Sequence, residues 1–306
     1  MAPAAGQGRS TVVVGYDGSE SAQQAVRWAA EYAASLQSPL RVVHAWVWPI
    51  FTKNLGPVKG VEGSGLRHSA ETILAEGVEQ ARQAYRPLSG VVPETTAGAG
   101  VPGDADGDAK GDAVEGVMET GLPAQVLRGA ARDARLLVIA SRGVGGLLGQ
   151  LAGSVCLELA GSSPCPLIVI RRPRSPGRSV VVGIDGTSRS SAALAGAVHL
   201  ATTLGTSLQV IHIDQTRGGD HNEHGRHTPL HGQEVLDQAL AEARKLAPEL
   251  AVSGELVHGR AASKELLAAA EDADVLVIGT HNREGGPGNT VSAVLHKARC
   301  NVLITR

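Results

Sequence analysis

The 306-residue sequence is poor in aromatic residues, poor in cysteine and nearly balanced in charge. Phe, Trp and Tyr together make up only 2% of it, so the hydrophobic core must be built from Ala, Val and Leu. Three cysteines without CxxC spacing argue against a disulfide framework and against a thiolate zinc site. A formal net charge of -2 provides no general attraction to nucleic acid or to an acidic membrane surface.

Long apolar runs are also missing. No stretch approaches the roughly 18 consecutive apolar residues of a transmembrane helix, and residues 1–11 lack the charged start and apolar core of a secretory signal. We therefore expect a protein of the reducing cytoplasm, with no nucleic-acid or membrane partner. The basic run from Arg171 to Arg178 is the exception. Its prolines and its position between two similar halves favour a solvated linker over a nucleic-acid patch.

The sequence does contain an internal repeat. VVVGYDGSESA at residues 12–22 recurs as VVVGIDGTSRSSA at residues 180–192, which pairs Asp17 with Asp185, and LRVVHAW recurs as LQVIHID, which pairs His44 with His212. The first half is longer in its middle and in its glycine-rich segment. The repeat predicts a first domain at residues 1–172 with an acidic, glycine-rich insertion at about 97–113, a linker at 173–179 and a second domain at 180–306.

Each copy alternates short β-branched runs with longer amphipathic stretches. In the first copy TVVVGY, LRVVHAW, AVEGVMET, RLLVIA and LIVI are predicted strands. Residues 21–36 are a predicted helix with Ala25, Trp28, Ala29, Tyr32 and Leu36 on one face. This alternation implies right-handed crossovers and a parallel sheet covered on both faces. We predict an α/β protein of two flavodoxin-like, Rossmann-like domains, each a five-stranded parallel sheet in the order 3-2-1-4-5.

In such a sheet, ligands bind where the winding reverses, between strands one and four. These strands end in YDGS and ASRGVGG, so Asp17 is expected beside the glycine-rich segment 140–154. Backbone N–H groups, the Arg142 guanidinium and the Ser154 hydroxyl can bind phosphate there, while Asp17 accepts a hydrogen bond from a base or sugar. The edge of strand two near Val43 can bind adenine through its backbone. The alternative is a plain turn in which Asp17 and Ser19 only cap the following helix.

VVVGYDGSESA, VVHAW, LPAQVL and ASRGVGGLLGQLAGSVCLELAGSSPCPLIVI resemble the universal stress protein family, and the two copies together resemble its tandem-domain bacterial members. The resemblance implies binding of ATP, or of ADP or AMP, with Mg²⁺ as an accompanying ion and slow hydrolysis at most. Asp17 and Val43 would contact the adenine. The remaining first-domain positions implied are Gly15, Ala140, Ser141, Arg142, Gly143, Val144, Gly145, Gly146, Gly153, Ser154 and Val155. Ala140 stands where the family has a glycine.

The second copy departs further from the family pattern. Asn282 replaces a glycine, Asn289 replaces Ser or Thr, and four residues are missing from the glycine-rich arc. We therefore predict a competent first site and an impaired or differently selective second site. The matching positions in the second copy are Gly183, Asp185, Ile211, Gly279, Gly288 and Asn289. Two alternatives from other classes are a nucleotide hydrolase or phosphotransferase and a nucleotide-free interaction scaffold. The sequence has no GxxxxGK[ST] motif, which excludes a P-loop NTPase.

Several conspicuous features have simpler explanations. The histidine-rich stretch at 214–231 and the acidic insertion are each expected to be polar loops rather than metal sites. The cysteines are expected to be buried small hydrophobic residues. The apolar last strands, LIVI and NVLIT, would be exposed sheet edges unless covered. The family resemblance implies that such edges pair between domains, giving an internal pseudo-dimer and allowing a homodimer.

Overall fold

The computed structural model describes residues 11–46, 64–86, 113–143, 152–187, 190–214, 232–280 and 286–306. In the first half, strands and helices alternate as β1 (Thr11–Gly15), α1 (Glu20–Ser35), β2 (Leu40–Trp46), α2 (Ser64–Ala84), β3 (Val114–Thr120), α3 (Pro123–Ala130), β4 (Ala134–Ala140), α4 (Ser154–Ser162) and β5 (Leu167–Ile170). The second half repeats the alternation as β6 (Val180–Ile184), α5 (Ser190–Leu204), β7 (Leu208–Asp214), α6 (Gly232–Leu246), β8 (Val252–His258), α7 (Ala262–Ala269), β9 (Val275–Gly279), α8 (Asn289–Lys297) and β10 (Asn301–Thr305).

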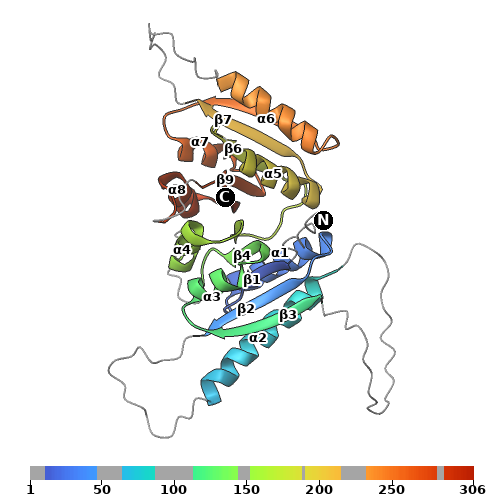
Figure 1. Cartoon of the computed structure of the whole chain (residues 1–306), viewed down its shortest axis with the longest axis vertical. Coiled ribbons are helices and arrows are strands. Elements are labelled where there is room, and N and C mark those ends of the chain that lie inside the picture. The colour runs from blue at the N-terminus through green and yellow to red at the C-terminus, as the bar shows by residue number, and fades with distance from the viewer. Residues whose placement is uncertain are drawn as a thin grey trace, which may run out of the picture.

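All ten strands form one continuous sheet in the order β3-β2-β1-β4-β5-β10-β9-β6-β7-β8 (Figure 1). Every neighbouring pair within each half is parallel, whereas β5 and β10 are antiparallel, with Ile168 opposite Leu303. The α/β class and the tandem arrangement are confirmed. The last strands, which sequence alone left as potential exposed edges, cover each other at the centre of the sheet. Association of two chains stays a prediction.

Helices cover both faces of the sheet, and each face has its own core. Apolar side chains of α1, α2, α5 and α6 pack with one face, and those of α3, α4, α7 and α8 pack with the other. Val12, Val13 and Val14 are fully buried because β1 lies inside the sheet and has helices above and below it. On α1, Trp28 stacks on Tyr32 with ring centroids 5.0 Å apart. Helix α1 thus contains two of the chain's few aromatic residues.

The basic run between the halves is exposed at Pro173 and at residues 176–178, as a solvated linker would be, but its first three arginines are docked. The guanidinium groups of Arg171, Arg172 and Arg174 donate to the backbone carbonyls of Leu295, Ala273 and Leu204. The carbonyls of Leu295 and Leu204 lie in the last turns of α8 and α5, which lack backbone partners and favour a cation, whereas Ala273 lies in the connection between α7 and β9. The side chain of Asn301 accepts from the backbone N–H groups of Arg171 and Arg172 at 2.9 and 3.2 Å. The part of the run from Arg171 to Arg174 is therefore docked on the second domain.

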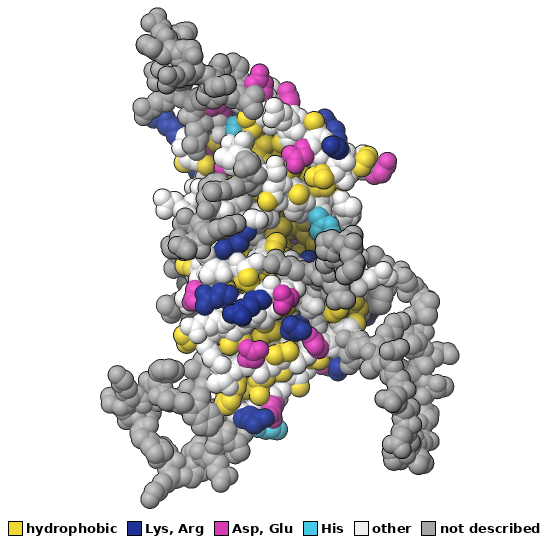
Figure 2. Space-filling view, viewed as in Figure 1, with side chains coloured by type: hydrophobic (Ala, Val, Ile, Leu, Met, Phe, Trp, Pro, Cys, Tyr) yellow, Lys and Arg dark blue, Asp and Glu magenta, His cyan; other side chains and the backbone are white. Residues whose placement is uncertain are grey.

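Other expectations can be checked in part. The three cysteines are free and buried, as predicted, and burial raises the pKa of the Cys156 thiol to about 12. No helix in the described residues is long and apolar enough to cross a membrane. Acidic and basic side chains are interspersed on the face shown in Figure 2. The stretches at 97–112 and 215–231 lie outside the described residues, and within the described ranges no three His, Cys, Asp or Glu side chains gather around a possible metal position.

Candidate nucleotide site

The turn from β1 into α1 holds Asp17 in place. Asp17 Oδ1 accepts hydrogen bonds from the backbone N–H of Ser19 at 3.1 Å and from its hydroxyl at 2.6 Å. Ser19 is the N-cap of α1, because its Oγ accepts from the N–H of Ala22 at 3.2 Å. Gly18 adopts a left-handed φ of 83°, which the turn requires. The capping interpretation is thus right for Ser19, and one oxygen of Asp17 supports that cap.

The other oxygen of Asp17 lies against the start of the glycine-rich segment. A Cβ added to Gly143 would come within 2.3 Å of Asp17 Oδ2, so any other residue at position 143 would displace the carboxylate. From α1, the hydroxyl of Ser21 donates to the carbonyl of Arg142 at 2.9 Å. The structure therefore brings Asp17 and the root of the segment together across more than a hundred residues, as the strand order predicted.

The root of the segment is closed by backbone hydrogen bonds. Ser141, which directly follows β4, donates its N–H to Ile170 at 3.0 Å and accepts the N–H of Gly153 at 3.0 Å. Gly153 is the N-cap of α4, and Ser154 and Val155 are its first residues. Gly153 has no side chain to cap the helix, so its first turn presents N–H groups that can bind an anion. Val144, Gly145 and Gly146 lie outside the described residues.

Strand β2 corrects one expectation. The carbonyl of Val43 already accepts the N–H of Tyr16 at 2.9 Å, and its side chain is buried in the core. Pairing between β1 and β2 ends at Gly15 and Val43, whereas β2 continues to Trp46. Because alternate residues of a strand face the same neighbour, Ala45 is the next residue facing the β1 side, beyond the last β1 pair. The Val43 backbone is therefore engaged within the sheet, contrary to the expectation that it binds a base, whereas Ala45 lies beyond the last β1 pair.

Gly15 and Gly183 have a packing role in the structure. A Cβ at Gly15 would lie 3.0 Å from Leu127 of α3, and one at Gly183 would lie 2.6 Å from Leu266 of α7. The glycines therefore allow each of these helices to approach the first strand of its domain closely. Ile211, the counterpart of Val43, is fully buried. Gly15, Gly183 and Ile211 therefore contribute to the two sites indirectly, through the packing of the strands that carry them.

A buried histidine in each copy also supports the strand ends. His44 Nδ1 lies 2.8 Å from the carbonyl of Tyr16, and His212 Nδ1 lies 3.1 Å from the carbonyl of Ile184. Since a carbonyl only accepts, Nδ1 is the donor in both rings. Each bond restrains the residue that directly precedes Asp17 or Asp185. The repeated His44–His212 pair was visible in the sequence, but its reach to the neighbouring strand end was not.

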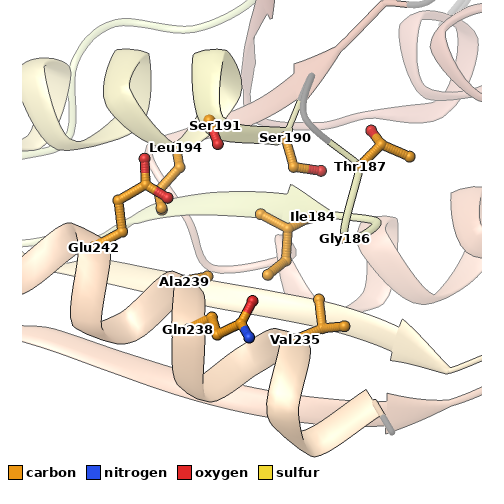
Figure 3. Close-up of a pocket in the computed structure, with 10 residues that line it drawn as sticks. All are labelled: Ile184, Gly186, Thr187, Ser190, Ser191, Leu194, Val235, Gln238, Ala239 and Glu242. Carbon is orange, nitrogen blue, oxygen red and sulfur yellow. The ribbon is translucent and has the colours of Figure 1, made fainter. Parts of the chain in front are cut away.

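The residue before the aspartate distinguishes the two copies. Tyr16 is buried under α2, and a Cβ on Gly77 would lie 2.5 Å from its ring. Burial, followed by the effects of Glu76, raises the pKa of Tyr16 to about 12. The second copy has Ile184 at this place, and a pocket opens between α5 and α6 (Figure 3). The pocket is lined by Ile184, Gly186, Thr187, Ser190, Ser191, Leu194, Val235, Gln238, Ala239 and Glu242.

The second site resembles the first only in outline. Asp185 Oδ1 accepts from the N–H of Thr187 at 3.0 Å, from the Thr187 hydroxyl at 2.7 Å and from the Ser190 hydroxyl at 2.5 Å. Asp185 is exposed, whereas Asp17 is half-buried. Gly279 ends β9, Gly288 is the N-cap of α8, and Asn289 begins that helix. Asn282, the counterpart of Gly143, lies outside the described residues.

Comparisons with known proteins agree with this architecture. The model of the Universal stress protein family matches residues 8–171 and again residues 177–306. Universal stress protein Rv1996 of Mycobacterium tuberculosis is 30% identical over 313 residues, covering 96% of this chain and 94% of its own. A universal stress protein structure from Archaeoglobus fulgidus shares the fold, with a TM-score of 0.68 and 17% identity over 98% of this chain and 99% of its own. A structure from the same species in complex with dAMP covers 43% of this chain and 100% of its own, with 21% identity and a TM-score of 0.35.

Proposed function

The chain belongs to the universal stress protein family, and on that premise we propose that it binds an adenine nucleotide, with ATP as the leading ligand, chiefly in its first domain. Occupancy would regulate a stress or dormancy response through a partner rather than through rapid turnover. The observation that carries this proposal is the contact between Asp17 Oδ2 and Gly143 at the root of the glycine-rich segment. A carboxylate and an open helix N-terminus then meet at one edge of the sheet.

The described groups suit the two ends of a nucleotide differently. Asp17 offers an acceptor for the ribose or base, and the backbone of Ala45 faces the same edge. At the other end, the first N–H groups of α4 and the Ser154 hydroxyl are donors suited to phosphate oxygens. Mg²⁺, where it accompanies ATP, would be held largely by the phosphates and water, since this cation keeps several waters in such sites. ADP and AMP would lose phosphate contacts but keep those of the adenosine.

The second domain is proposed to bind the nucleotide weakly or with another selectivity. In the first domain, Gly143 is required because a Cβ there would meet Asp17. The matching residue of the second domain is Asn282, which carries a Cβ. A side chain at this position does not fit the close approach of carboxylate and glycine on which the first-domain site is built. The four missing residues shorten the same arc.

Calorimetric titration of the full chain with ATP, ADP and AMP tests the proposal. Gly143→Ala should weaken ATP binding at least about tenfold, because the new methyl displaces the Asp17 carboxylate. Gly129→Ala is the matched control, since a Cβ added there would meet nothing within 4 Å beyond its chain neighbours and the backbone of its own helix. Absence of binding for all three nucleotides would contradict the proposal and favour the interaction scaffold. Equal ATP affinities of Gly143→Ala and Gly129→Ala would show that the Asp17–Gly143 contact does not support ATP binding.

A further inference from the structure

Helix α4 connects the first-domain site to the second domain. Its N-terminus at Ser154 follows the N-cap Gly153, and its nine residues span about 13 Å. At its far end, a Cβ added to Gly161 would lie 2.6 Å from the Cα of Gly286. Gly286 lies two residues before Gly288, the N-cap of α8 in the second domain. One end of α4 is therefore at the proposed phosphate position, and the other touches the opposite domain.

An arginine from the second domain caps that far end. Arg306 follows β10, and its guanidinium donates to the carbonyl of Ala160 at 3.0 Å. Ala160 lies in the last turn of α4, whose carbonyls have no partner within the helix. The arrangement is reciprocal, because Arg171, which follows β5, donates to Leu295 in the last turn of α8. Each domain thus caps the helix of the other across the β5–β10 pair.

The sequence of α4 makes such support necessary. SVCLELAGS is shorter than isolated helices that are stable in water. It also contains residues of low helix propensity, among them Val155, Cys156 and Gly161. An anion at the N-terminus and a cation at the C-terminus both favour the helical state of the same segment. Binding of phosphate at one end and docking of Arg306 at the other should therefore reinforce each other.

We propose that Arg306 is a positioning residue for the first-domain nucleotide site, so that the phosphate cradle at the start of α4 is fully formed only when the second domain is docked at its end. This inference rests on the proposed function for its ligand. It adds that the two domains act as one binding unit. It also makes nucleotide occupancy able to change how tightly the domains are held together.

The test uses the full chain with Arg306→Ala, Arg306→Lys and the control Arg299→Ala. Arg299 is mostly exposed and lies 3.8 Å from an equally exposed Glu271, so its removal should change little. Calorimetric titration with ATP, well below the unfolding temperature, should show about three- to tenfold weaker binding for Arg306→Ala. Arg306→Lys should restore most of the affinity, because an ammonium can still donate to the Ala160 carbonyl. ATP binding by Arg306→Ala equal to that of the wild type would overturn the inference.

Hydrogen exchange without nucleotide separates this inference from the proposed function. Amides of residues 154–162 should exchange faster in Arg306→Ala than in the wild type and in Arg299→Ala, because a docked end stabilises the short helix. Unchanged exchange in α4 would overturn the positioning role whether or not ATP binds. Faster exchange of these amides in Arg306→Ala, together with no ATP binding by the wild type, would contradict the proposed function. It would still support the stabilisation of α4 by the second domain.

Discussion

The two domains share a fold but differ in what lies beneath and beside the aspartate that both copies carry, Asp17 and Asp185. In the first domain Tyr16 fills the space under α2, and Asp17 is half-buried against Gly143. In the second, Ile184 leaves a pocket between α5 and α6, and Asp185 is exposed with its Oδ1 bonded to local hydroxyls (Figure 3). The strands and helices repeat between the two copies, whereas the residues that surround the strand ends differ. We therefore expect the two domains to differ in nucleotide binding because these residues differ.

The largest expected effect comes from transferring the second domain's packing into the first. Gly77→Ala would place a methyl 2.5 Å from the Tyr16 ring, and we expect a loss of about 2 kcal/mol in the free energy of unfolding. Ala239 of α6 is the counterpart of Gly77, since Gly254 faces Leu236 and Leu240 as Gly116 faces Leu74 and Val78. Because Ile184 and Ala239 line one pocket in the second domain, the double variant Tyr16→Ile/Gly77→Ala should recover part of that loss. Chemical denaturation of the two single variants and the double variant gives the coupling energy. Strictly additive losses would show that the tyrosine and the glycine are not a matched pair.

A smaller effect is expected from the paired histidines. Removing the Nδ1 donor by His44→Ala or His212→Ala leaves a strand-end carbonyl without its partner, at a cost of about 1 to 2 kcal/mol in each case. Only His44→Ala should also weaken ATP binding, because the carbonyl it holds directly precedes Asp17. Denaturation and calorimetric titration of both variants check this. If both variants changed ATP affinity equally, the first domain would not be the main site.

The smallest effect concerns Asp274, which stands where the first copy has Arg135. Burial raises the pKa of Asp274 despite the nearby Arg172, Arg174 and Arg178, so ionisation is harder in the folded chain than in the unfolded chain. Its contribution to stability therefore falls as the pH rises from the ordinary value of 3.8 through the raised pKa.

Asp274→Asn keeps an oxygen that can accept the N–H of Ser175, which lies 3.1 Å from Asp274 Oδ1. The variant should lose less stability than the wild type between about pH 4 and pH 7, by less than about 1 kcal/mol. Denaturant unfolding at several pH values measures this difference. A steeper fall in the variant would mean that the arginines, rather than burial, dominate the pKa of Asp274.

The sequence allowed the architecture and the meeting of Asp17 with Gly143 to be predicted, for a simple reason. Parallel strands with helical crossovers place the carboxyl ends of β1 and β4 side by side, whatever the details of packing. The hydrogen bonding of the Val43 backbone depends instead on the register of β1 and β2, whose last pair is Gly15 with Val43. A strand pattern does not fix that register, so the sequence predicts a free backbone edge near Val43, whereas the pairing with β1 extends to Val43 and ends before Ala45.

The basic segment between the domains shows a second reason why part of the structure could not be predicted from the sequence. Arginines beside prolines and glycine have the composition of a solvated segment, and their partners are backbone carbonyls far away in the sequence. Backbone carbonyls leave no signature in a sequence, because every residue has one. The docking of Arg171 and the cap supplied by Arg306 therefore became visible only once α4 and α8 were placed beside the β5–β10 pair.

The central claim is that two copies of one domain contain unequal nucleotide sites. The most direct measurement is the stoichiometry of ATP binding to the full chain, by calorimetry, with and without Gly143→Ala. We predict about one tightly bound ATP per chain, and loss of that tight site in the variant. Two equivalent ATP molecules per chain, or one tight site that survives Gly143→Ala unchanged, would contradict the account.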